Sequence, residues 1–173
     1  MAPVGGCSDD GGEPVEVEIG TGTVAYESLA AEQSFEVIEG PQGGHHVYLH
    51  VRMRGLRPGD PRVSDGPDNP DTRFQVFNED GVQVDTGTAL YRLGYREGAE
   101  EWLELPSGRL VFLDEPLVAT LVDRPMTVSV EIVDSDGSVA SDQRQVTGLE
   151  IPLVSGELRS PTWGEHQRSP DSL

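Results

Sequence analysis

Five segments of this chain alternate apolar and polar side chains, and this period of two constrains the fold more than any other feature. It places every second side chain on the same side of the backbone, as in a β-strand with one buried face. Two further apolar runs lack this period and are expected to be inner strands or strands buried on both sides. The alternating segments are 15–19, 35–37, 46–54, 73–76 and 126–132, and the two apolar runs are 110–113 and 117–122. These patterns predict an all-β protein.

Glycine-containing turns separate the predicted strands. Residues 39–44 are Glu-Gly-Pro-Gln-Gly-Gly, and Asp-Gly pairs stand at 80–81 and 136–137. Glycine adopts positive φ at little cost, and Asp-Gly is a strong hairpin signal. No convincing amphipathic helix is present, since 29–32 gives one turn at most. About eight short strands with this spacing predict a single antiparallel immunoglobulin-like β-sandwich over 15–155.

The two ends of the chain differ from this middle part. Residues 1–14 and 156–173 are rich in small, acidic and turn-forming residues and have no hydrophobic period, so both are predicted to be disordered. No apolar run approaches the roughly 20 residues that a membrane span needs. We therefore expect one domain between a tether and a tail.

Charge and motifs exclude several function classes. The chain has 12 arginines, no lysine and 31 acidic residues, for a net charge of −19. This charge disfavours nucleic acid and anionic membrane surfaces, because it repels their phosphates. The absence of lysine excludes Schiff-base chemistry, and none of the common nucleophile, zinc-protease or phosphate-loop motifs occurs. The sequence therefore predicts a protein without enzymatic activity.

Cys7 is the only cysteine of the chain. The segment Val-Gly-Gly-Cys at 4–7 resembles the end of a bacterial lipoprotein signal, where a cysteine after small residues is lipidated and becomes the mature N-terminus. The Ser-Asp-Asp-Gly-Gly segment that follows would form a flexible tether. Only six residues precede Cys7, without the charged and apolar regions of a complete signal. The alternatives are a lipid-anchored protein whose signal is not included here and an incidental thiol.

A wider resemblance extends from Cys7 to about residue 60. Its features are the tether, the strand at 15–19, the Gly-Pro-Gln-Gly-Gly turn at 40–44 before His45 and His46, and Leu-Arg-Pro-Gly at 56–59. Together they resemble uncharacterised lipoproteins of myxobacterial type. The resemblance implies a cell-envelope location and a β-sandwich, but no activity.

One face of the predicted strand at 46–54 gathers cationic and aromatic side chains: His46, Tyr48, His50, Arg52 and Arg54. One interpretation is pairing with acidic rows on neighbouring strands, such as Glu16, Glu18 or Glu36. The other is a ligand face for an anionic glycan or protein partner, with Tyr48 as a stacking platform.

Three metal sites are also conceivable. His45 and His46 could hold copper or zinc if the backbone is irregular there, since adjacent strand residues point to opposite faces. The loop with Asp65, Asp68, Asn69 and Asp71 could supply oxygen ligands for calcium, as could a second cluster of Asp134, Asp136 and Asp142. Aspartate and asparagine are also ordinary turn residues, and the histidines could simply belong to a polar strand face.

These observations predict a non-enzymatic module, lipid-anchored in the bacterial cell envelope, that binds an envelope protein or glycan or gives structural support. The alternative is an envelope protein that binds calcium, copper or zinc. We expect no nucleic-acid partner and no obligatory cofactor, with calcium as the possible exception.

Overall fold

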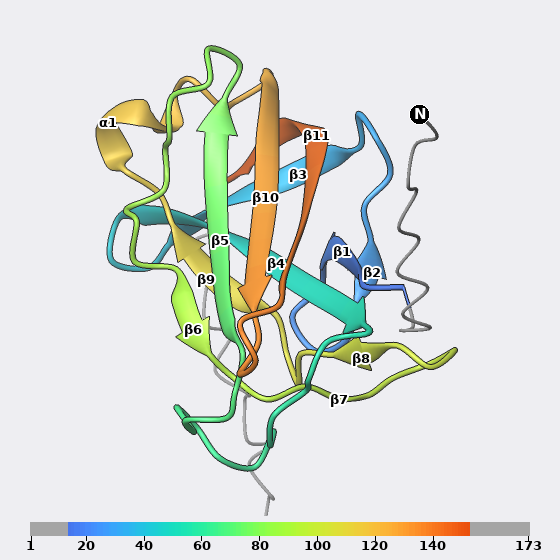
Figure 1. The fold of residues 1–173 in the computed structure, drawn as a ribbon. Coiled ribbons are helices and arrows are strands. Elements are labelled where there is room, and N and C mark those ends of the chain that lie inside the picture. Colours follow the sequence, from blue (N-terminus) through green and yellow to red (C-terminus); the bar gives the residue numbers. More distant parts are fainter. Residues whose placement is uncertain (1–13, 153–173) are drawn as a thin grey trace, which may run out of the picture.

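The structure is a computed structural model that describes residues 14–152 (Figure 1). Strands dominate it, and its one helix has four residues, so the predicted all-β class is confirmed. In chain order the elements are β1 (Glu16–Thr21), β2 (Glu27–Ser28), β3 (Ser34–Gly40), β4 (Gly44–Arg54), β5 (Asp71–Asn78), β6 (Leu90–Arg92), β7 (Arg96–Glu97), β8 (Leu103–Glu104), β9 (Arg109–Phe112), α1 (Glu115–Val118), β10 (Pro125–Val133) and β11 (Val139–Ile151). No helix in this part of the chain is long and apolar enough to cross a membrane.

Strand β4 organises the fold because both of its edges are paired. On one edge it pairs with β3 near its start and with β1 near its end. On the other edge it pairs with β9 and then with β8. All pairs of β4 are antiparallel, and all are continuous with one 11-stranded sheet.

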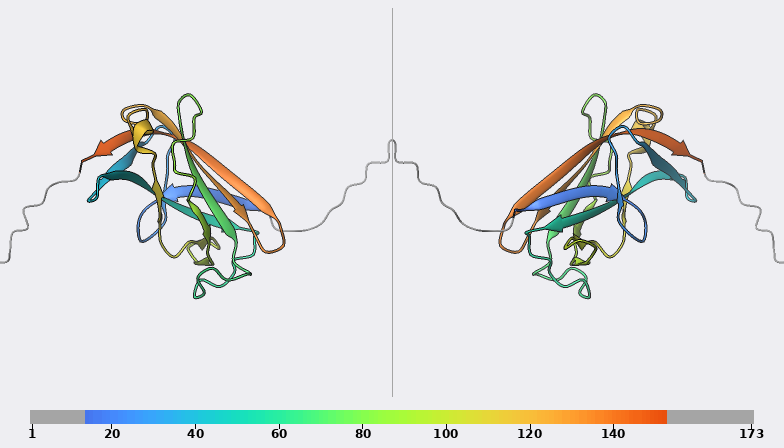
Figure 2. Two further views of the ribbon diagram at one scale, coloured as in Figure 1. Left: turned by 90° about the vertical axis from the view of Figure 1, so that its left-hand side faces the viewer. Right: turned by 90° about the vertical axis from the view of Figure 1, so that its right-hand side faces the viewer.

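The sheet curls on itself. β4 runs obliquely behind β5 and β10 in Figure 1, and the side views of Figure 2 show the long strands crossing at an angle. Asp142 on β11 accepts a hydrogen bond from the backbone N–H of Ile19 on β1 at 2.9 Å, which links strands from different parts of the sheet. The result is a curled sheet around a single hydrophobic core.

The expectation of antiparallel strands alone is wrong. β11 pairs with β10 as the predicted hairpin, but it then extends past the last pair, Pro125 with Thr147. Its final residues pair in parallel with β3, from Thr147 opposite Ser34 to Ile151 opposite Ile38. A hairpin turn fixes only the local antiparallel pairing, and a 13-residue strand has length left for a second neighbour.

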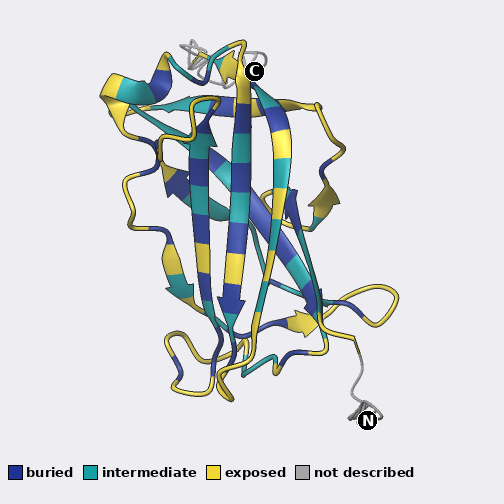
Figure 3. Cartoon of the chain, turned by 45° about the horizontal axis from the view of Figure 1, so that its top comes forward, coloured by how far each residue is buried: buried dark blue, intermediate teal, exposed yellow. Residues whose placement is uncertain are grey.

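The predicted alternation is visible as burial. Along β10 every second side chain, from Met126 to Ile132, is buried, and Figure 3 shows the same banding on β5. The inward residues of β4, which are Val47, Leu49, Val51 and Met53, have no exposed surface. Burial of one face of the long strands therefore holds the sheet together.

Of the two apolar runs without a period, the first forms a strand as predicted and the second does not. Residues 110–112 belong to β9, but Phe112 is 52% exposed, so this strand is not buried on both sides. Residues 117–122 contain the end of α1 and the turns after it instead of a strand. Proline in the first turn of α1 favours a helical start, because its ring fixes φ near the helical value.

Candidate functional site

The outward face of β4 is divided into an open half and a covered half. His46 and Tyr48 lie in the first half, beside β3 and β9. Arg52 and Arg54 lie in the second half, between β1 and β8. The five predicted ligand-face residues therefore share one face of one strand, but they have different surroundings.

The open half contains a groove of about 550 Å³, which we call the β4 groove. Its floor is aromatic: the His46 ring lies edge-on to Tyr48, with centroids 5.4 Å apart, and 6.4 Å from Phe112. The groove is lined by Gly40, Pro41, Gln42, Gly43, Gly44, His46, Tyr48, Leu110 and Phe112.

Strand register explains why these residues meet. Phe112 stands opposite His46 and Leu110 stands opposite Tyr48, so β9 adds two apolar side chains to the same face. The Gly-Pro-Gln-Gly-Gly turn joins β3 to β4 and forms one end of the groove. Gly43 has a φ of 76°, which a residue with a side chain rarely adopts, and a Cβ there would meet open space. The glycine therefore serves the backbone conformation of the turn.

The groove contains a histidine that is uncharged near neutral pH. Burial lowers the pKa of His46 below its ordinary value, and the neighbouring His45 lowers it further. No arginine lines the groove among the described residues. The site therefore offers aromatic faces and neutral polar groups.

In the covered half, the arginines are paired with acidic residues of a neighbouring strand, as one of the two interpretations predicted. Arg52 donates to Glu18 Oε2 from Nε at 2.9 Å and from Nη2 at 2.7 Å, and Arg54 pairs in the same way with Glu16. The β1–β4 register sets Glu18 opposite Arg52 and Glu16 opposite Arg54. These two arginines are engaged within the protein, so they do not form a free cationic ligand face.

Aromatic rings complete this half. The Arg52 guanidinium lies 4.5 Å from the centroid of the Tyr26 ring and 4.4 Å from that of Trp102. Arg54 lies 4.7 Å from the Trp102 centroid. The indole is 5% exposed, and such stacking against guanidinium groups is stabilising. The ion pairs and the aromatic rings together cover this half of the β4 face.

His50 does not belong to an exposed ligand face, which corrects the prediction. The residue has no exposed surface. Its partner on β1 is Gly20, and the Tyr26 ring occupies the space beside that glycine. The centroids of the Tyr26 and His50 rings are 5.9 Å apart. Burial lowers the pKa of His50 to about 4. A glycine on a neighbouring strand thus lets an aromatic ring cover the position.

The two adjacent histidines point to opposite faces of β4, as their sequence positions predict. His45 Nδ1 lies 2.9 Å from Glu115 Oε2 on α1, and Nε2 lies 3.6 Å from Glu150 Oε1 on β11. The contact with His45 lowers the pKa of Glu115. Residues 14–152 contain no group of three histidine, cysteine, aspartate or glutamate side chains arranged to hold a metal ion. His45 instead ties three elements together.

The structure does not bring the predicted calcium ligands together. Asn69 is buried and holds its own loop, since Oδ1 accepts from the Asp60 N–H at 2.7 Å and Nδ2 donates to the Val63 carbonyl at 2.7 Å. Asp71 is paired with Arg92. Asp65 and Asp68 are exposed. These contacts fit turn-forming and pairing roles.

The second acidic cluster also has structural partners. Asp134 accepts backbone hydrogen bonds from Arg57, Asp136 and Ser138. Asp142 is bonded to β1 and to Arg144. These interactions fix a hairpin and join two strands.

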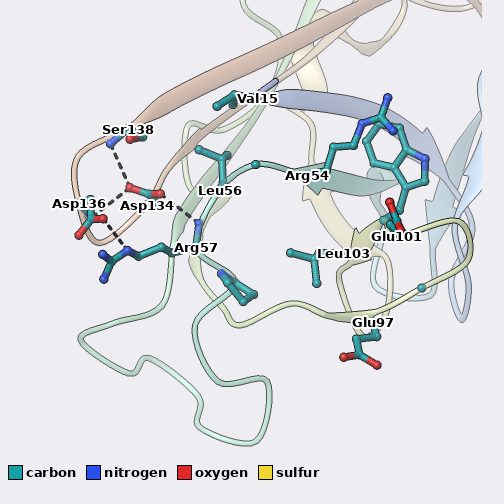
Figure 4. A pocket seen from close by; sticks show the side chains of 14 residues that line it. Val15, Arg54, Leu56, Arg57, Glu97, Glu101, Leu103, Asp134, Asp136 and Ser138 are labelled. Atoms are coloured by element: carbon teal, nitrogen blue, oxygen red, sulfur yellow. Dashed lines mark hydrogen bonds and ion pairs between the residues drawn. The ribbon is translucent and has the colours of Figure 1, made fainter. Parts of the chain in front are cut away.

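Another hollow, of about 950 Å³, lies beside this hairpin (Figure 4). Arg57 pairs with Asp136 at one end of it, and Arg54 lies near the other end with its guanidinium against the indole. The walls between them include Val15, Leu56 and Leu103. Both arginines are paired with carboxylates, so neither is free to receive an anion.

Sequence reasoning missed Phe112 and Trp102. The lack of a period in 110–113 concealed which face Phe112 occupies, although a phenylalanine next to a strand end was a detectable signal. Trp102 stands among glutamates in the sequence, which gave no sign that its side chain is buried. Cys7, the tether and the tail from 156 lie outside the described residues, apart from Pro14.

Comparison with known proteins gives little more. No protein-family model matches the chain, and neither does the sequence of a curated protein. Among solved structures, CopC from Methylosinus trichosporium OB3b aligns with 70% of this chain and 86% of its own, at 13% identity and a TM-score of 0.31. A likeness this weak carries no argument about function.

Proposed function

We propose that this protein is a non-enzymatic binding module of the bacterial cell envelope, anchored through lipidated Cys7, whose ligand site is the β4 groove. The curled β-sheet serves as a rigid support, in the manner of immunoglobulin-like sandwiches. Binding sites on such supports require few residues, because strands hold side chains in fixed positions.

The exposed ring of Phe112 is the observation that carries this proposal. It is 52% exposed although it stands in a paired strand next to the His46 ring, which in turn contacts Tyr48. Exposing a large aromatic surface costs free energy, and clustered exposed aromatic side chains are typical of binding sites. The groove also follows the Gly-Pro-Gln-Gly-Gly turn that marks the resemblance to envelope lipoproteins.

A non-enzymatic role agrees with the neighbouring chemistry. His46 is the one ionisable side chain in the groove apart from the Tyr48 phenol, within the part of the chain described. General acid–base catalysis needs such a group beside a partner that orients it or takes part in the reaction. The contacts of His46 are the rings of Tyr48 and Phe112.

Co-sedimentation with cell envelopes tests the binding site. The probe is the insoluble envelope fraction of the source bacterium, after lipid extraction so that anchoring contributes nothing. We expect the full chain to sediment with this fraction and Phe112→Ala to remain in solution. Val139→Ala is the matched control, since Val139 is 58% exposed and lies on β11 outside the groove. Equal sedimentation of all three proteins would refute the groove as the site.

The anchor requires a separate experiment. Mass spectrometry of the N-terminal peptide from source membranes should find a diacylglyceryl group on Cys7 as the first residue. A peptide that begins before Cys7 and has a free thiol would remove the envelope argument.

The metal-binding alternative has less support. His45 is engaged with Glu115, and the loop residues Asn69 and Asp71 have partners of their own. Bound metal stabilises a folded protein. A rise in melting temperature with calcium, copper or zinc that His45→Gln or Asp71→Asn removes would favour this alternative.

A further inference from the structure

The β4 groove continues into a second hollow on the same face of the sheet. This hollow, of about 340 Å³, lies where β3 and β4 separate beyond the pair Ile38–His46. Tyr48 lines both spaces and lies between them. Together they form an elongated surface, aromatic at one end and polar at the other.

The polar end has a specific chemistry. Its hydrogen-bonding groups are hydroxyls, an amide and carboxylates, from Thr21, Thr23, Glu27, Gln33, Ser34 and Glu36. Hydroxyls and amides both donate and accept hydrogen bonds, and carboxylates accept them. No arginine lines this hollow among the residues described.

Most arginines elsewhere in the described part of the chain are paired with carboxylates. Seven of those within residues 14–152 form ion pairs with carboxylates, and these are Arg52, Arg54, Arg57, Arg62, Arg92, Arg124 and Arg144. The net charge of −19 further disfavours an anionic ligand. The expectation of an anionic glycan therefore does not fit the site.

We propose that this surface binds a neutral, linear oligosaccharide, with sugar rings on Phe112 and Tyr48 and sugar hydroxyls toward Gln33, Ser34 and Glu36. This inference rests on the proposed binding function and names the class of its ligand.

Two features favour a sugar over other neutral ligands. A sugar ring has an apolar face whose C–H groups carry partial positive charge, and these groups are attracted to the negative face of an aromatic ring. Its edge carries hydroxyls that donate as well as accept, which suits the mixed polar groups beyond Tyr48. Thr21 Oγ1 and Gln33 Oε1 already have partners in the protein, but Ser34 and Glu36 are exposed to water. A purely apolar ligand would displace water from Ser34 and Glu36 without replacing its hydrogen bonds, at a cost in free energy.

Titration calorimetry with sugars that differ in charge tests the proposal. The probes are soluble oligosaccharides of about six rings, a length suited to an extended groove. Neutral members are glucose oligomers of several linkages, mannose oligomers and N-acetylglucosamine oligomers. Glucosamine oligomers supply the cationic match to the last of these, and galacturonate oligomers are anionic.

We expect the full chain to bind at least one neutral series, with an affinity that changes little with salt. Phe112→Ala and Tyr48→Ala should each weaken binding about tenfold or more. Tyr48→Phe keeps the ring and should retain most of the affinity. Val139→Ala should bind as the wild type does, and thermal unfolding of each variant checks that it is folded.

Each other outcome overturns the proposal in a distinct way. If envelope binding depends on Phe112 but no neutral sugar binds, the ligand class is wrong and the groove remains the site. Salt-sensitive binding of galacturonate or glucosamine oligomers alone has the same meaning. If the full wild-type chain binds neither the envelope fraction nor any of the sugars, the proposed function is refuted as well. Sugar binding that Phe112→Ala and Tyr48→Ala leave unchanged places the sugar elsewhere on the protein.

Discussion

The two halves of β4 carry similar side chains and yet form opposite kinds of surface. In the first half, His46 and Tyr48 lie beside the exposed Phe112 in an open groove. In the second half, Arg52 and Arg54 are enclosed by carboxylates and by the Trp102 ring. The same strand, with the same period, therefore has an open surface, where we propose that a ligand binds, and a covered surface that stabilises the fold.

Neighbouring strands produce this difference. β1 places Glu16, Glu18 and Gly20 opposite the second half, so each side chain of β4 meets a charge partner or a space that an aromatic ring fills. β9 places Leu110 and Phe112 opposite the first half, which adds apolar area without covering it. Cross-strand partners thus decide whether a side chain of β4 stays open or is enclosed by the fold.

We expect the largest difference between the two halves when one large aromatic ring is removed from each and the free energy of unfolding is compared. Trp102→Ala should lower the free energy of unfolding by about 3–5 kcal/mol, because a buried ring and its guanidinium contacts are lost. Phe112→Ala should lower it by less than about 1 kcal/mol, since half of that side chain is already in water. Urea unfolding measures both values. A similar loss of unfolding free energy in the two variants would contradict the division of β4 into an open and a covered half.

Acid should destabilise the covered half through His50. Its pKa is about 4 in the folded protein and about 6.5 in an unfolded chain. Between these values the unfolded chain binds the proton and the folded protein does not, so stability falls as the pH is lowered. One such proton contributes a slope of up to about 1.4 kcal/mol per pH unit.

Urea unfolding from about pH 7.5 to about pH 5, above the range where most carboxylates titrate, measures this slope. His50→Gln should flatten it, and His46→Gln should flatten it less, because the pKa of His46 is lowered to a smaller extent. An unchanged slope in His50→Gln would show that the ring is solvated.

The ion pairs between β1 and β4 should contribute least to the free energy of unfolding. Glu18→Gln should cost about 1 kcal/mol, because Glu18 and Arg52 are 34% and 22% exposed. Glu16→Gln should cost about 0.3 kcal/mol, since both partners of that pair are 41% exposed. Double-mutant cycles with Arg52→Ala and Arg54→Ala give the coupling energies. A larger coupling for Glu16 than for Glu18 would contradict this ranking.

Local patterns predicted the strands well but not their neighbours. The alternation of Val47, Leu49, Val51 and Met53 identifies the core face of β4, and Asp-Gly at 136–137 identifies the last hairpin. Both depend on contacts between residues close in sequence. The parallel pairing of β11 with β3 joins segments more than a hundred residues apart, and no local pattern encodes it.

For the candidate site, too, local patterns predicted residues on one strand but not the residues that neighbouring strands contribute. His46 and Tyr48 were identified because they alternate on one strand, whereas Phe112 enters the site only through the β4–β9 register. His50 was assigned to the ligand face because its cover, Tyr26, comes from a loop beside a different strand. Cross-strand partners, which turn a polar strand face into a site or a support, are set by tertiary pairing.

The histidine ring signals in an NMR titration test this account most directly. With a neutral oligosaccharide as the probe, we predict that the His46 ring protons shift with increasing ligand while those of His50 stay unchanged, because only His46 lines the groove. His46→Gln and His50→Gln assign the signals. Shifts at His50 without shifts at His46, or no shift at either ring while the sugar binds, would contradict the division of β4 into a recognition half and a structural half.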